Sequence, residues 1–271
     1  MSSHTQSVLE FNFSDADIIL VGGDDQKRRF AVHKCILSAA SPVFKDMFML
    51  PQPKVIGDAL PVINMTESSK ILSVFLQFIY PVPNPTISSL EELVLVLEAA
   101  KKLDVDVAID SLRKQLIHSN NVDNEPLRVY AIAARFDLQE ELKVAAKYTL
   151  KKNVLDCPLS KDLKYITAYD YHRLLDLHRR HSRAMQAALL PKRYACSGHN
   201  CNPARWWTAF VEAANKELSE RPSTDIIFQP EFLLRCLPPQ NYCSLCAYSA
   251  LRSYPDFLIL KKKIDELPFT V

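Results

Sequence analysis

The sequence predicts an α+β fold that is mostly α-helical, with a small sheet near the N-terminus and helices through the rest of the chain. Two short runs at residues 16–21 and 29–32 are rich in Ile, Val and Phe, and they flank the turn sequence Gly-Gly-Asp-Asp at residues 22–25. This is the pattern of a β-hairpin. Further along, apolar residues recur at helical spacing. The first such stripe comprises Ile71, Leu72, Phe75, Phe78 and Ile79.

The individual elements follow from local signals. Residues 33–40 and 42–48 are expected to form two short helices that divide at Ser41 and Pro42, because serine is a good N-cap and proline suits the first helical turn. Residues 60–64 are expected to form another short strand. Ser88 and Glu91 have the spacing of a capping box that opens a helix ending at Leu103. Further helices are predicted at 105–117, 126–136, 139–152, 168–190, 205–218, 243–252 and 256–267.

The overall charge indicates neither a nucleic-acid binder nor a membrane protein. The 271 residues include 33 basic and 31 acidic side chains, giving a net charge of +2. Direct nucleic-acid binding usually needs a strongly basic surface, so it is not expected. Charges interrupt every apolar stretch before the roughly 18 residues that a membrane span needs. The polar N-terminus lacks the apolar core of a signal peptide, which predicts an intracellular protein.

Glycine is scarce, and this bears on enzymatic function. The four glycines are Gly22, Gly23, Gly57 and Gly198. Loops that cradle phosphates and the nucleophile elbow of serine hydrolases need glycines at close, fixed spacing. None of these motifs can be formed here, so a non-enzymatic protein is expected. An enzyme that relies on some other motif is the alternative.

Three stretches resemble a BTB/POZ domain. They are Asp-Ala-Asp-Ile at residues 15–18, Phe-Ala-Val-His-Lys-Cys-Ile-Leu-Ser-Ala-Ala-Ser-Pro-Val-Phe-Lys-Asp-Met-Phe at residues 30–48, and Phe-Leu-Gln-Phe-Ile-Tyr at residues 75–80. The resemblance covers residues 14–118 and implies a small sheet flanked by helical hairpins. Residues 1–13 are then a flexible tail, 119–190 a helical extension and 191–271 a cysteine-containing helical region. The arrangement resembles fungal BTB-domain proteins with a helical C-terminal extension.

The resemblance implies a protein-interaction scaffold or adaptor whose partners are proteins and which self-associates through the BTB/POZ domain. One alternative is a substrate adaptor of a cullin-RING ubiquitin ligase. Another is a transcription regulator that acts through partners, since the sequence has no zinc-finger array or basic recognition helix.

Two candidate sites come from the resemblance. Asp17 and Lys34 match positions that form a charged pocket near the dimer interface of some family members, although a strand-start carboxylate and a solvated lysine would look the same. Leu72, Val74 and Phe75 match the helix surface that meets a partner in cullin adaptors. Those adaptors often carry Glu where this chain has Val74, so cullin binding is expected to be weak or absent.

His33 precedes a predicted helix without a companion nucleophile or metal ligand. We therefore interpret it as a structural residue that packs under the helix and bonds to the backbone, rather than as a catalytic group.

Cysteines cluster in the last third of the chain. Cys196, Cys201, Cys243 and Cys246 form two close pairs, and four thiolates in two pairs can complete a tetrahedral zinc site. His199 and Cys236 are reserve ligands. The alternative is that these are buried thiols without a metal. No other cofactor is predicted.

Two remaining features are interpreted without a functional role. Residues 172–183 present a basic helix face, which we interpret as solvated because Asp176 interrupts it. The basic and histidine side chains are His172, Arg173, His178, Arg179, Arg180, His181 and Arg183. Trp206 and Trp207 are adjacent, so they cannot both face one core from a helix. One is expected to be exposed or to pack on a neighbouring segment.

Overall fold

The structure is a computed structural model that describes residues 10–50, 59–190, 192–196, 201, 203–237 and 244–269. The chain divides into two compact units, one ending at Asn121 and the other beginning at Val122. Below, they are called the N-terminal unit and the C-terminal unit. The boundary predicted between residues 190 and 191 falls inside the C-terminal unit.

The N-terminal unit contains the predicted sheet. It consists of β1 (Ile18–Val21), β2 (Arg29–Val32) and β3 (Val62–Asn64) in the order β2-β1-β3. β1 is antiparallel to β2 and parallel to β3. The chain leaves β1 at Gly22, where a Cβ atom would lie 2.8 Å from the Cα atom of Ser69. Only glycine allows this close backbone approach, which seats the start of the helix that begins at Ser69 against the hairpin.

Residues 10–13, which the sequence assigned to a flexible tail, are packed against β2. The Ala31 N–H donates to the carbonyl of Phe11 at 3.0 Å, and Asn12 pairs with Ala31 in a parallel bridge. Phe11 is only 2% exposed, and its ring centroid lies 5.2 Å from that of Tyr80. The correction has a physical cause, because burial of the Phe11 ring and the backbone hydrogen bonds to Ala31 together offset the entropy lost when the segment is ordered.

Two short helices follow β2 as predicted. They are α1 (Lys34–Ala40) and α2 (Pro42–Met49). The buried Ser41 hydroxyl caps α2 by accepting a hydrogen bond from the Phe44 N–H at 3.0 Å, and it donates to the carbonyl of Leu103. The division at Ser41 and Pro42 is confirmed, and the same serine connects α2 to a later helix.

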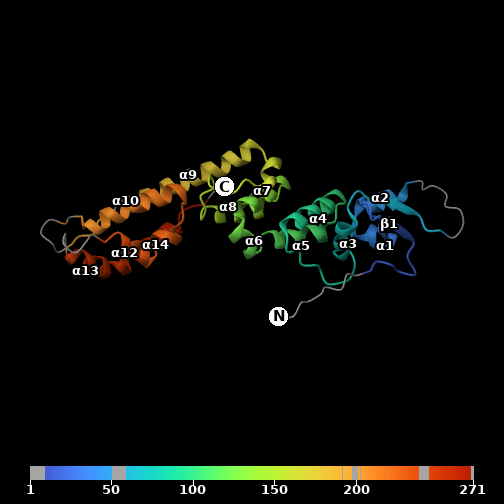
Figure 1. The fold of residues 1–271 in the computed structure, drawn as a ribbon, viewed down its shortest axis with the longest axis horizontal. Coiled ribbons are helices and arrows are strands. Elements are labelled where there is room, and N and C mark those ends of the chain that lie inside the picture. Colours follow the sequence, from blue (N-terminus) through green and yellow to red (C-terminus); the bar gives the residue numbers. More distant parts are fainter. Residues whose placement is uncertain are drawn as a thin grey trace. The chain divides into compact units, whose positions relative to one another are not determined.

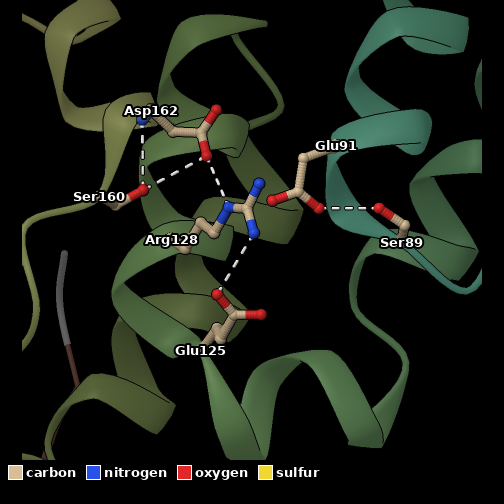
Figure 2. Close-up of polar contacts among 6 residues, drawn as sticks. All are labelled: Ser89, Glu91, Glu125, Arg128, Ser160 and Asp162. Atoms are coloured by element: carbon tan, nitrogen blue, oxygen red, sulfur yellow. Dashed lines mark hydrogen bonds and ion pairs between the residues drawn. The ribbon is translucent and has the colours of Figure 1, made fainter.

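Three longer helices complete the N-terminal unit, namely α3 (Ser69–Gln77), α4 (Leu90–Lys102) and α5 (Asp106–Leu116). The capping box predicted from Ser88 and Glu91 is wrong. The N-cap of α4 is Ser89, and its hydroxyl donates to the Glu91 carboxylate at 2.7 Å instead of capping the backbone, as Figure 2 shows. Glu91 stays in the first helical turn, where the helix dipole favours a negative charge.

In the described residues of the C-terminal unit, the regular elements are all helices. α6 (Ser119–Asn124) leads into it from the N-terminal unit. The elements that follow are α7 (Pro126–Arg135), α8 (Gln139–Thr149), the 3-10 helix η1 (Lys161–Tyr165), α9 (Ala168–Leu189), α10 (Arg205–Glu220), α11 (Thr224–Ile227), α12 (Pro230–Arg235), α13 (Ser244–Arg252) and α14 (Tyr254–Asp265). The sequence did not predict α6, η1, α11 or α12. Each is six residues or shorter, too short for a periodic pattern.

α9 and α10 run antiparallel (Figure 1). The Gln186 side chain donates to the Asn215 carbonyl at 3.1 Å, and the Trp207 indole donates to the Lys192 carbonyl at 2.8 Å. Both tryptophans of the chain are buried, Trp206 among the helices and Trp207 under the segment at 192–196. Trp207 thus packs on a neighbouring segment, one of the two outcomes expected for the pair.

The core of this region is aromatic. Phe210 is fully buried in α10, and four aromatic rings surround it at centroid distances of 4.9–6.2 Å. These rings belong to Trp207, Phe228, Phe232 and Phe257. Phe210 therefore connects α10 with α12, α14 and the turn after α11.

Candidate functional site

α1 has an unusual distribution of side chains for a helix of a folded unit. Its sequence is Lys-Cys-Ile-Leu-Ser-Ala-Ala, and Leu37 is its one fully buried residue. Cys35 and Ala39 are exposed, and Ile36 and Ala40 are half-buried. A helix with this much apolar surface normally buries it against another element. α1 therefore presents apolar surface that the N-terminal unit leaves uncovered.

Asp17 and Lys34, the predicted charged pocket, lie together at the beginning of α1. The Asp17 carboxylate accepts a hydrogen bond from the backbone N–H of Lys34 at 2.7 Å. Asp17 is exposed and Lys34 is half-buried. This contact stabilises the first turn of α1, because a carboxylate satisfies a helix N–H group that has no partner within the helix. The carboxylate thus orients the helix that carries the uncovered apolar surface.

His33, just before α1, is held by a tyrosine. Its backbone N–H donates to the Tyr80 hydroxyl at 2.9 Å, and its Nδ1 lies 3.1 Å from the same oxygen. Because this oxygen accepts from the backbone, its own hydrogen is available to Nδ1, and the ring proton then sits on Nε2. Nε2 lies 3.2 Å from the Asp15 carboxylate, whose pKa the hydrogen bond from His33 lowers. The ring therefore holds together Tyr80, Asp15 and the start of α1.

The predicted partner surface on α3 needs correction. Leu72 and Phe75 are 0% exposed. They belong to the apolar stripe that packs α3 into its own unit, so they cannot contact a partner. Val74 alone of the three is partly exposed. It lines a groove of about 600 Å³ beside Lys70, Gln77 and the segment at residues 85–88.

Three of the four predicted metal ligands converge in the C-terminal unit. The Sγ atoms of Cys196, Cys201 and Cys246 lie within 4.8 Å of one another. Cys243, the fourth predicted ligand, and the reserve ligand His199 lie outside the described residues. The Cys236 thiol, the other reserve ligand, donates to the Phe232 carbonyl of its own helix at 3.2 Å.

A largely buried ion pair in the C-terminal unit could not be predicted from the sequence. Figure 2 shows Arg128 of α7, whose Nε lies 2.6 Å from the Asp162 carboxylate and whose Nη1 lies 3.3 Å from Glu125. Asp162 is 7% exposed and also accepts from the Ser160 hydroxyl. These partners fix η1 against α7, which is a structural role. Arg128 and Asp162 are 34 residues apart in sequence, so no local pattern could have paired them.

His178 also differs from its predicted role on a solvated basic face. It is 8% exposed, and its Nε2 lies 3.0 Å from the Thr149 hydroxyl of α8. Arg180 and Asp176 form an ion pair at 2.7 Å along the same helix.

Among the described helices, none is long and apolar enough to cross a lipid bilayer.

The N-terminal unit is a small sheet edged by helical hairpins, in which polar groups near α1 hold that helix in place. Comparison with known proteins identifies the family that has this fold. The family model described as the BTB/POZ domain matches residues 9–120. A BTB/POZ domain-containing protein of Arabidopsis thaliana is 32% identical over 151 residues, which cover 55% of this chain and 77% of that protein. The chain belongs to the BTB/POZ family.

Proposed function

We propose that the chain is a non-enzymatic, intracellular adaptor that self-associates through its N-terminal unit and binds a protein partner through its C-terminal unit. The observation that carries the proposal is the apolar surface of α1, which the unit orients but leaves uncovered. A second copy of the chain would bury Ile36 and Ala39. Burying this apolar surface would favour association, because it removes the surface from water.

The polar groups beside α1 support a binding role over a catalytic one. His33 bonds to both Tyr80 and Asp15, and Asp17 holds the start of the helix. A catalytic base needs a reacting group within hydrogen-bond reach. Here the nearest partners of these groups are structural.

The C-terminal unit offers a second apolar surface on two helices that pack together, α13 and α14. The exposed large apolar residues of these helices are Leu245, Tyr248, Leu251, Leu258 and Ile259. Exposed apolar residues that gather on neighbouring elements are typical of binding surfaces. A partner bound here would be brought to the assembly that the N-terminal units form.

The first prediction concerns self-association of the full chain. Light scattering after size exclusion at micromolar concentration is expected to give a mass above the 30.8 kDa of one chain. Ala39→Glu is expected to return the mass to 30.8 kDa, because it places a charge in the contact without touching the core of the unit.

The matched control is Ala184→Glu, the same change at an exposed position of α9 in the other unit. It is expected to leave the mass unchanged. A wild-type chain that stays at 30.8 kDa across this concentration range would contradict the proposal.

The alternative role as a cullin adaptor is tested at Val74. The wild type is expected to retain little cullin N-terminal domain in a pull-down, because valine lacks the carboxylate that could bond to the scaffold. Val74→Glu is expected to increase the amount retained. Val74 is partly exposed, so the new carboxylate can reach solvent and the unit should stay folded.

Val74→Gln is the matched control, because glutamine has nearly the same shape as glutamate but carries no charge. Tight cullin binding by the wild type that does not change in Val74→Glu would contradict this expectation. It would favour the role as a cullin adaptor and would show that Val74 does not limit the contact.

A further inference from the structure

We propose that Cys196, Cys201 and Cys246 bind one zinc ion as thiolates, forming a structural metal centre within the C-terminal unit. The site is separate from the surface proposed for self-association, since its three cysteines belong to the C-terminal unit and α1 belongs to the N-terminal unit. Its role is to fix the segment at residues 192–196 and the start of α10 to the helix α13.

The distances between the sulfurs carry the proposal. The Sγ atoms of Cys201 and Cys246 are 3.9 Å apart, and all three lie within 4.8 Å of one another. Two thiolates bound at about 2.3 Å to one tetrahedral zinc are separated by about 3.8 Å. A disulfide would require a sulfur separation of about 2.05 Å, so the observed spacing suits a shared ion better than a bond.

A set of specific hydrogen bonds places the three cysteines. In α13, Ser249 lies one turn after Cys246, and its hydroxyl donates to the carbonyl of Ala195, next to Cys196, at 2.8 Å. The Ala204 N–H donates to the carbonyl of Tyr194 at 2.7 Å, which holds the segment containing Cys201 beside the one containing Cys196.

The same serine connects these segments to α10. The indole N–H of Trp206 donates to the Ser249 hydroxyl at 3.3 Å. The cysteines are therefore held by residues that already have hydrogen-bond partners. Hydrogen bonds around the ligands help to orient them in metal sites.

Burial and charge favour a metal over neutral thiols that merely share a core. Cys246 is 0% exposed, Cys201 is 6% exposed and Cys196 is half-buried. Cys246 lies in the first turn of α13, where the helix dipole stabilises a thiolate. Several buried thiolates repel one another unless a cation lies between them, and a divalent, thiophilic ion such as zinc meets that need. Binding releases one proton from each thiol, so zinc affinity falls as the pH is lowered.

The test is elemental analysis of the full chain, purified under reducing conditions without metal-affinity resin or chelator. About one zinc per chain is expected for the wild type. The variants Cys196→Ser, Cys201→Ser and Cys246→Ser are expected to lose most of it. The matched control is Cys157→Ser, a half-buried cysteine of the same unit whose thiol donates to the Asn153 carbonyl, and it should keep the metal.

A second measurement does not depend on the folding of the variants. Wild-type protein in which cobalt replaces zinc is expected to show the thiolate-to-cobalt charge-transfer band and the visible bands of a tetrahedral site. Wild-type protein that contains no zinc and gives no such bands would overturn the proposal. A disulfide that joins two of these three cysteines, located by mass spectrometry of unreduced peptides, would overturn it too.

Discussion

Replacing Phe210 with alanine is expected to lower the free energy of unfolding of the C-terminal unit by about 3–5 kcal/mol, the usual loss when a buried phenylalanine is truncated. Phe210 is 0% exposed and sits among four aromatic rings from separate segments. Those segments are tied to one another elsewhere, so the cavity cannot close without disturbing several helices. The loss should lie toward the upper end of the range.

Tryptophan fluorescence can measure this effect in one unit alone. The chain has two tryptophans, Trp206 and Trp207, both buried in α10. Chemical denaturation followed by their emission therefore reports the C-terminal unit. Phe210→Leu is the matched control, because it keeps most of the volume and should lose less. Equal losses for alanine and leucine would show that the packed volume at this position does not set the stability.

Acidification is expected to destabilise the C-terminal unit through His178. Burial lowers the pKa of this residue from 6.5 to about 4, with a smaller contribution from His181. The Thr149 hydroxyl donates to the Ala146 carbonyl, so it accepts the Nε2 proton of His178. This hydrogen bond fixes the ring between α8 and α9, and burial favours its neutral form.

The sign of the pH effect follows from the direction of the shift. Above pH 6.5 the ring is neutral in both the folded and unfolded chain, and stability is full. Between 6.5 and about 4 the unfolded chain binds a proton that the folded chain does not, so stability falls as the pH falls. The complete loss is about 3 kcal/mol, since each pKa unit corresponds to about 1.4 kcal/mol.

The measurement is the denaturation midpoint of tryptophan emission from pH 7.5 down to about 4.5. His178→Gln is expected to lose the contribution of this histidine, about 3 kcal/mol, and to keep the contribution that release of zinc from the cysteines makes at low pH. His172→Gln changes an exposed histidine on the same helix and should behave like the wild type. If the denaturation midpoint of His178→Gln depended on pH as steeply as that of the wild type, other groups would be responsible for the dependence. One of them is the half-buried His181, whose pKa is also lowered by burial.

Features with local causes could be predicted from the sequence. The β-hairpin, the break at Ser41 and Pro42, and the longer helices all depend on neighbouring residues or on periodicity. The packing of residues 10–13 and the η1 helix could not be predicted. Phe11 is ordered by Tyr80, and Asp162 is ordered by Arg128, and these partners are distant in sequence.

The candidate sites divide in the same way. The spacing of the cysteines in the sequence predicted a shared site, and three of these cysteines lie close together in the part of the chain that the structure describes. The partner surface on α3 was wrong because it was transferred from a motif, while the helical stripe already placed Leu72 and Phe75 on the inner side. His178 was wrongly placed on the surface because charged neighbours on one helix say little about which residue faces a second helix.

The segment at residues 10–13 has a practical consequence for dividing the protein. It closes the outer edge of β2, whose Ala31 N–H and C=O both bond to it. A fragment that began at residue 14, where the motif resemblance starts, would leave that edge open and strip Phe11 from the core. Open strand edges beside exposed apolar surface lead to aggregation. Such a fragment would give misleading evidence of self-association, because non-specific aggregation and specific dimerisation both raise the measured mass.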